Sequence, residues 1–128
     1  MIVGLRERKS ETQDKKPTRY FSKNQEKTVA NRLGGSTTLN SGATPFQKGD
    51  INVGNLLLVE CKTKTKDSDS ISIKKEWLDK NSKEALFMGK KYNTIAFNFG
   101  PNQRNYYILD EVLFEEFLNY LKAIHSEE

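Results

Sequence analysis

The most constraining feature of the sequence is a continuous apolar run that ends directly in charged residues. Leu56 to Val59 is uniformly aliphatic, which indicates a central strand buried on both faces of a sheet. The run continues into Glu60, Cys61 and Lys62. Because side chains alternate along a strand, Glu60 and Lys62 project to one face, and Cys61 joins the apolar residues on the other. Ionised groups are costly at the edge of a core, so this strand end is a candidate functional site.

The pattern around this strand predicts an α/β fold, with a mixed central β-sheet flanked by helices. A capping box of Ser22 and Gln25 is expected to begin the first helix, and Asp110 to cap the last one. The expected order is α-β-β-β-α-β-β-α. Its elements are a helix over about 23–33, a strand-and-turn region or irregular loop at 36–49, strands at 51–53 and from 56 outward to about 66, a helix over about 74–88, strands at 94–99 and 106–109, and a final helix after residue 110.

Composition excludes several kinds of chemistry. The 128 residues include one cysteine, which rules out an intrachain disulfide and a zinc site of several cysteines. The single histidine, His125, argues against a Ser/His or Cys/His nucleophilic site. No apolar run reaches the roughly 18 residues of a membrane span, and the N-terminus does not resemble a signal peptide. We therefore expect a cytoplasmic protein without a membrane partner, whose chemistry would rest on carboxylates, lysines and hydroxyls.

The chain is expected to divide into an N-terminal arm and one folded domain. Residues 1–20 are rich in charge and carry no large apolar residue between Leu5 and Tyr20, so they cannot bury enough surface to fold alone. The arm is either a basic segment that contacts nucleic acid or a solvated terminus. Residues 21–128 form the domain. A net charge of +4, from 21 basic and 17 acidic residues, is compatible with a polyanionic partner.

A metal site is expected at the end of the apolar strand. Gly54-Asn55 is a good hairpin turn, and a hairpin there would bring Asp50 close to Glu60. Two carboxylates beside Lys62 suit Mg²⁺, which takes one or two carboxylates together with water and phosphate oxygens. Lys62 could then position a water molecule or stabilise charge on a phosphate. The alternative is an ordinary surface ion pair between these groups and Lys62.

These residues resemble a known enzyme superfamily. Lys48-Gly49-Asp50 followed by the stretch Leu57–Lys62 is similar to the core motif of the PD-(D/E)XK nucleases, and most similar to the small Holliday-junction resolvases of archaea and phages, of the Hjc type. The resemblance covers about residues 22–110. It implies that Glu26, the only acidic residue of the first predicted helix, is a further ligand, and that Ser41 matches a functional serine in the loop before the aspartate.

The resemblance implies a restriction-endonuclease-like core and a DNA endonuclease that acts on four-way junctions. Glu26, Asp50 and Glu60 would hold Mg²⁺ or Mn²⁺, Lys62 would assist the attacking water, and cleavage would leave a 5′-phosphate. Family members are homodimers, so a homodimer is implied here too, in the cytoplasm of the host cell if the protein is encoded by a phage. Two alternatives stay open: a nuclease of this fold acting on duplex, nicked or flapped DNA, and a DNA-binding module without catalysis.

Several residues are candidates for contact with DNA. The candidate phosphate contacts are Arg19, Lys48, Lys64, Lys74 and Lys75. Lys64 would continue the strand face of Glu60 and Lys62, whereas Lys66 fits a solvated strand edge better. Lys74 and Lys75 open a helix, where positive charge is unfavourable unless an anion is nearby.

Aromatic residues and the last helix complete the expected surface. Tyr106 and Tyr107 could stack on bases, although one core and one exposed tyrosine is the simpler expectation. Trp77 fits either a core or a dimer interface. The last helix is acidic on its outer side and is expected to face away from DNA.

Overall fold

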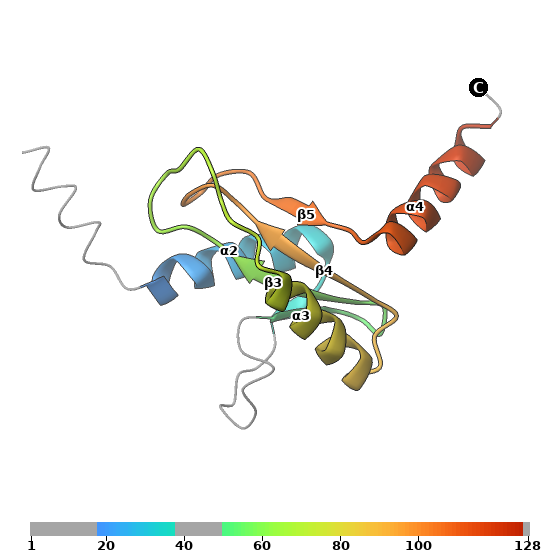
Figure 1. Ribbon diagram of the computed structural model, residues 1–128, viewed down its shortest axis with the longest axis horizontal. Coiled ribbons are helices and arrows are strands. Elements are labelled where there is room, and N and C mark those ends of the chain that lie inside the picture. Colours follow the sequence, from blue (N-terminus) through green and yellow to red (C-terminus); the bar gives the residue numbers. More distant parts are fainter. Residues whose placement is uncertain (1–17, 38–49, 127–128) are drawn as a thin grey trace, which may run out of the picture.

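The computed structural model describes residues 18–37 and 50–126, with the side chains of Thr18 and Arg19 excepted. Within these ranges the elements follow the predicted order α-β-β-β-α-β-β-α (Figure 1). The elements are α2 (Thr18–Leu33), β1 (Ser36–Thr37), β2 (Asp50–Val53), β3 (Leu57–Lys62), α3 (Lys75–Phe87), β4 (Tyr92–Phe97), β5 (Tyr106–Ile108) and α4 (Glu111–Ile124). The predicted α/β class with a mixed sheet is confirmed.

The five strands form one sheet in which neighbours in sequence are neighbours in space, in the order β1-β2-β3-β4-β5. The β3–β4 pair is parallel and the other three pairs are antiparallel. The turn that joins β2 to β3 contains the predicted Gly54-Asn55 and also Leu56, which is exposed and, contrary to expectation, does not belong to the buried strand. Gly54 adopts a φ of 56°, which a residue without a Cβ tolerates best. The parallel pair needs a long crossover, and α3 supplies it.

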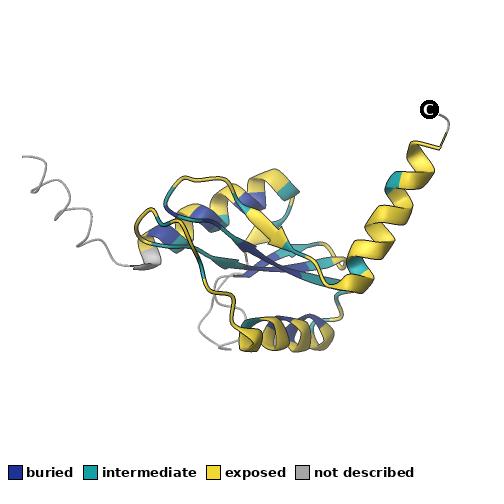
Figure 2. Ribbon diagram, turned by 45° about the horizontal axis from the view of Figure 1, so that its top comes forward, coloured by how far each residue is buried: buried dark blue, intermediate teal, exposed yellow. Residues whose placement is uncertain are grey.

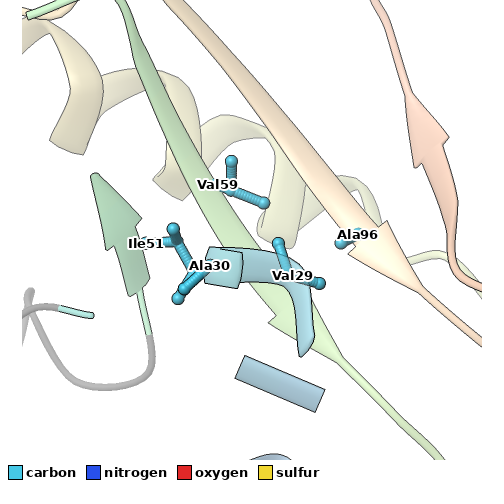
Figure 3. Packing of buried hydrophobic residues seen from close by; sticks show 5 residues of the cluster. All are labelled: Val29, Ala30, Ile51, Val59 and Ala96. Carbon is cyan, nitrogen blue, oxygen red and sulfur yellow. The ribbon is translucent and has the colours of Figure 1, made fainter. Parts of the chain in front are cut away.

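Helices α2 and α3 cover opposite faces of the sheet (Figure 2). On the α2 face, Val29 and Ala30 pack against Ile51, Val59 and Ala96 from three adjacent strands (Figure 3). Cys61 and Leu57 pack at the border of this cluster, which confirms the prediction that Cys61 belongs to the core side of β3. The side chains of Glu60 and Lys62 therefore belong to the α3 face.

Two predicted boundaries are wrong. Helix α2 begins at Thr18, about five residues before the expected start, so Ser22 lies inside the helix and cannot act as its N-cap. Strand β3 ends at Lys62, and the alternating Lys-Thr sequence that follows does not extend the strand. Lys64 and Lys66 therefore do not continue the strand face of Glu60. Alternation of polar residues alone cannot hold a strand without a neighbour to accept its hydrogen bonds.

Helix α4 projects from the body (Figure 1). The predicted cap is confirmed, since Asp110 Oδ1 accepts a hydrogen bond from the Leu113 amide at 2.8 Å. The Tyr92 hydroxyl donates a hydrogen bond to Glu116 and ties the helix to the start of β4. No residue of α4 is buried, although its apolar stripe is the most regular in the chain. In the described part of the chain, no helix has the length and apolar character needed to cross a membrane.

Candidate metal centre

The β2–β3 hairpin brings Asp50 and Glu60 together as predicted. The two residues are direct partners in the antiparallel register. Both side chains are buried, with 1% of Asp50 and 8% of Glu60 exposed. Two carboxylates enclosed at one strand end repel each other and lose their hydration, so the fold holds them there against a clear energetic cost.

A third carboxylate, Glu84 of α3, joins them. One oxygen from each of Asp50, Glu60 and Glu84 lies within 4.8 Å of the other two. Glu84 is 4% exposed. These three residues, which we call the acidic cluster, are the group of potential metal ligands found within residues 18–37 and 50–126.

Helix α3 is fixed to the sheet by a buried asparagine one turn before Glu84. Asn81 is 0% exposed, and its Nδ2 donates to the main-chain oxygen of Thr94 at 2.9 Å. This hydrogen bond sets the rotation of α3 about its axis, and the inward face then carries Glu84. Trp77, Asn81, Glu84 and Met88 follow the i, i+4, i+7, i+11 spacing of one helix face. Asn81 and Glu84 are polar residues on this otherwise apolar face, and that pattern in the sequence could have indicated a functional helix face.

Two lysines accompany the cluster. The Nζ of Lys62 lies 4.5 Å from the centre of the Trp77 ring, a cation–π contact that holds the ammonium on the α3 face. The Nζ of Lys80 lies 3.8 Å from Oε1 of Glu84, one turn away on the same helix. Trp77 is half-buried and interacts with Lys62, so within this chain it serves the site as well as the core.

Burial and mutual repulsion shift the pKa values of these carboxyl groups. Burial, followed by the negative charge of Glu84, a side-chain hydrogen bond with Glu84 and the charge of Glu60, raises the pKa of Asp50 from 3.8 to about 8. Burial also raises the pKa of Glu60, and the positive charge of Lys62 opposes this. At neutral pH Asp50 therefore holds a proton that a bound cation would replace.

The donor set fits a hard divalent cation. Oε2 of Glu60 is buried and accepts no hydrogen bond from the described residues, and among these residues only the Asp50 carboxyl group is a possible donor to the buried oxygens of Glu84. Such oxygens are normally paired, and a cation coordinated by oxygen would satisfy them together. Oxygens that coordinate Mg²⁺ at about 2.1 Å lie roughly 3 to 4 Å from one another. The three carboxylate oxygens lie within 4.8 Å of one another, so small side-chain movements would bring them to coordinating distances. The acidic cluster could therefore bind a metal ion.

Glu26, the ligand implied by family resemblance, is not part of the acidic cluster. It lies on α2, which covers the opposite face of the sheet. Burial raises the pKa of the Cys61 thiol, and the charges of Glu26, Asp50 and Glu60 raise it further. The two strand carboxylates are therefore joined by Glu84 from α3 and not by Glu26 from α2.

Other candidate residues have mixed outcomes. Ser41 and Lys48 lie outside the described residues, as does the side chain of Arg19. Lys74 and Lys75 are exposed at the start of α3, where Lys75 pairs with Asp79 at 2.8 Å. Lys64 is half-buried in the segment after β3.

Comparisons with protein-family models, with curated proteins and with solved structures each found no significant match.

Proposed function

We propose that this protein is a metal-dependent endonuclease that hydrolyses phosphodiester bonds in DNA. The observation that carries the proposal is the acidic cluster, three buried carboxylates at the end of β3 with Lys62 beside them. Asp50, Glu60 and Glu84 would hold Mg²⁺ or Mn²⁺. When bound, such an ion polarises a phosphate and lowers the pKa of water.

The lysines supply the charge that a dianionic transition state requires. Lys62 lies on the same face as Glu60 and is restrained by the Trp77 ring, so its ammonium can orient a water molecule or stabilise an oxygen of the phosphate. Lys80 balances part of the negative charge of Glu84. Asp50 must lose its proton before it can act as a ligand, and alkaline pH favours that loss.

The topology supports a restriction-endonuclease-like core for this site. The order α-β-β-β-α-β-β-α places an acidic residue on each strand of a hairpin, and α3 follows the second of these strands. The motif from Asp50 through Glu60 and Lys62 resembles that of the PD-(D/E)XK nucleases. The ligand set proposed here departs from that pattern by using Glu84 in place of Glu26.

A four-way junction is the first candidate substrate, because the sequence motif most resembles that of the junction resolvases. Symmetric cleavage of a junction needs two active sites, so the proposal includes a homodimer. The exposed apolar face of α4 is the proposed contact. Its exposed residues include Phe114, Phe117, Leu118 and Ile124.

The charges of α4 favour a second copy of the same helix as its partner. Glu111 and Glu115 lie in its first half, and Lys122 lies in its last turn. In an antiparallel pair centred near Leu118, Lys122 of one copy would lie opposite Glu115 of the other, twice by symmetry. An apolar stripe flanked by self-complementary charges is typical of a two-fold interface.

The proposed function is tested by cleavage of labelled four-way junction, flap, nicked and blunt duplex DNA of one sequence, with Mg²⁺ or EDTA. We expect metal-dependent cleavage by the wild type and loss of cleavage in Asp50→Asn and Glu60→Gln. The Asp69→Asn variant, at an exposed loop position, is the matched control. Preference for the flap or duplex would support the nuclease and exclude the resolvase. Absence of cleavage with every substrate would favour a DNA-binding module.

A further inference from the structure

An open cleft of about 930 Å³ lies beside α2, at the carboxyl ends of the parallel strands β3 and β4. Its lining includes Gln25 from α2, Thr63 directly after β3 and Asn98 directly after β4. Ligands of open α/β sheets bind preferentially outside the carboxyl ends of parallel strands. The volume is at the upper end of the range for small-molecule sites, roughly 300–1,000 Å³.

Two loops close together form one wall of this cleft. The β3–α3 loop and the β4–β5 loop run side by side (Figure 1), and the Ser68 amide donates to the Phe99 oxygen at 2.8 Å. Gln103 Nε2 donates to Asp67 Oδ1 at 2.8 Å. A Cβ at Gly100 would lie 2.8 Å from the Cα of Asp67, so only glycine permits this approach. The wall is therefore built by specific contacts.

A buried hydrogen-bond acceptor in the cleft has no partner. The Nε2 of Gln25 donates to the main-chain oxygens of Lys62 at 2.8 Å and Ala96 at 3.2 Å. Both oxygens can only accept, so the orientation of the amide is fixed and Oε1 points elsewhere. Gln25 is 5% exposed, and Oε1 has no hydrogen-bond partner among the described residues. Oε1 is closed off from solvent, so Gln25 serves the cleft by fixing α2 to the ends of β3 and β4.

Neighbouring amides extend this polar surface. Asn105 Oδ1 accepts from Asn98 Nδ2 at 3.3 Å and lies 3.0 Å from Gln25 Nε2, whose two hydrogens are shared among three acceptors. Asn98 Oδ1 in turn accepts from the Thr63 hydroxyl at 2.6 Å. The Asn105 NH₂ group then remains for a ligand acceptor. The cleft thus offers an amide donor that can hydrogen-bond to an acceptor on the edge of a nucleobase.

Aromatic rings and guanidinium groups complete the cleft. Tyr107 of β5 lines it from the sheet, and Tyr20 and Phe21 line it from α2. Arg32 and Arg104 add two positive charges. Burial raises the pKa of Tyr107, so its hydroxyl stays protonated, and the charge of Arg32 is close enough to oppose that rise. Contrary to the expectation of one core tyrosine, Tyr106 and Tyr107 are both exposed, and Tyr106 stacks on Phe97.

We propose that this cleft binds an unpaired nucleotide of a DNA strand. The base would stack on Tyr107 and accept a hydrogen bond from the Asn105 amide, and the adjoining phosphate would contact Arg32 and Arg104. Stacking on aromatic rings combined with a basic surface is the usual means of binding single strands. The proposal deepens the proposed function, on which it rests for the identity of the strand as substrate, because it selects branched or partly unpaired DNA over regular duplex.

The cleft and the acidic cluster share the last residues of β3. Gln25 holds the main-chain oxygen of Lys62, while the Lys62 side chain lies over Trp77 on the other face. Glu60 is two residues earlier, about 7 Å along an extended strand. A strand with an unpaired base in the cleft would therefore have to cross the carboxyl ends of β3 and β4 to bring a phosphate to the metal ligands on the other face.

The test is binding of a labelled ten-nucleotide DNA strand, measured by fluorescence anisotropy in EDTA so that no cleavage takes part. We expect Tyr107→Ala to weaken binding at least fivefold, because stacking of one base is worth about that much or more. Arg104→Ala should also weaken binding, because it removes a phosphate contact. The matched controls, Phe87→Ala and Lys91→Ala, change exposed residues away from the cleft lining and should bind like the wild type. Arg104 is an exposed loop residue, so its variant should fold normally.

Ligand variants separate the possible sources of binding. A ten-residue abasic strand should bind at least fivefold more weakly, and blunt duplex should compete poorly. The proposal is wrong if the abasic strand binds equally well, or if both cleft variants behave like their controls. It is also wrong if deoxyadenosine monophosphate or inorganic phosphate competes as strongly as the strand, since the ligand would then be a free nucleotide or an anion. If no DNA substrate is cleaved but the normal strand still binds more tightly than the abasic strand, the nuclease proposal is refuted and the nucleotide site in the cleft is retained.

Discussion

Replacement of Asp50 by asparagine should stabilise the metal-free protein while removing its metal site. The carboxyl group of Asp50 is 1% exposed and lies within 4.8 Å of two other carboxylates. Asparagine has nearly the same shape, carries no charge at any pH and can still donate a hydrogen bond to Glu84. The substitution therefore removes the electrostatic cost of the site with little change in packing.

The size of the effect follows from the pKa of Asp50. Its pKa is about 8 in the folded protein and 3.8 ordinarily, so the folded state retains a proton that the unfolded chain releases. The contribution of Asp50 to the free energy of unfolding is thus highest below pH 4 and falls as the pH rises toward 8. Because pH 7 lies about three units above the ordinary pKa of Asp50, the loss in unfolding free energy at this pH is about 4 kcal/mol at most. The Asp50→Asn variant should recover much of this lost unfolding free energy at pH 7.

Urea unfolding in EDTA at pH 4.5 and pH 7, followed by circular dichroism, measures the difference. The gain in unfolding free energy should be small at pH 4.5 and should reach about 2–4 kcal/mol at pH 7. Addition of Mg²⁺ at pH 7 should raise the midpoint of the wild type and leave that of Asp50→Asn unchanged. Asp69→Asn, at an exposed position in the loop after β3, should match the wild type throughout.

A destabilised Asp50→Asn protein at pH 7 would refute this reasoning, because it would mean that the carboxylate is stabilised in the fold and carries no excess repulsion. If Mg²⁺ raised the urea midpoint of both proteins equally, Asp50 would not be a metal ligand.

Three further predictions concern the catalytic lysine, the α3 anchor and the α4 interface. Lys62→Met should lower cleavage at saturating Mn²⁺ about 100-fold while Mn²⁺ affinity in calorimetry stays within threefold, and equal loss of both would make Lys62 a structural residue. Asn81→Ala should lower the unfolding free energy in urea by about 1–3 kcal/mol, because the buried Thr94 oxygen loses its donor, and an unchanged midpoint would contradict that anchoring role. Phe117→Asp should convert a dimer to a monomer in sedimentation at micromolar concentration, whereas Asn119→Asp, on the opposite side of α4, should not, and a wild type that is already monomeric would reject the interface.

Local patterns in the sequence predicted the hairpin and the position of its carboxylates. The Gly54-Asn55 pair located the turn, but the pairing of Asp50 with Glu60 needs the three-residue loop from Gly54 to Leu56, because a two-residue turn would pair Asp50 with Val59. The core orientation of Cys61 follows from the alternation of side chains along the strand. These features depend on residues close in sequence, where geometry leaves few choices.

Glu84 could not be assigned in this way, because its place depends on how α3 packs on the sheet. On the sequence, Asn81 interrupts an apolar stripe, and only the hydrogen bond to Thr94 shows that the interrupting residue faces inward. The cleft beside α2 was equally inaccessible, since its wall depends on contacts between two loops about 35 residues apart. For α4 the sequence predicted the helix and its apolar face correctly, but it did not predict that this face is exposed. Helical periodicity indicates an apolar face without indicating what covers it.

Calorimetric titration of Mn²⁺ at pH 8 into the wild type, Glu84→Gln and Glu26→Gln tests the central claim most directly, because the two variants make the same change on helices that cover opposite faces of the sheet. The acidic cluster of Asp50, Glu60 and Glu84 predicts that Glu84→Gln weakens Mn²⁺ binding at least tenfold and that Glu26→Gln stays within twofold of the wild type. Retained affinity in Glu84→Gln, or loss of affinity in Glu26→Gln alone, would contradict the metal centre described here.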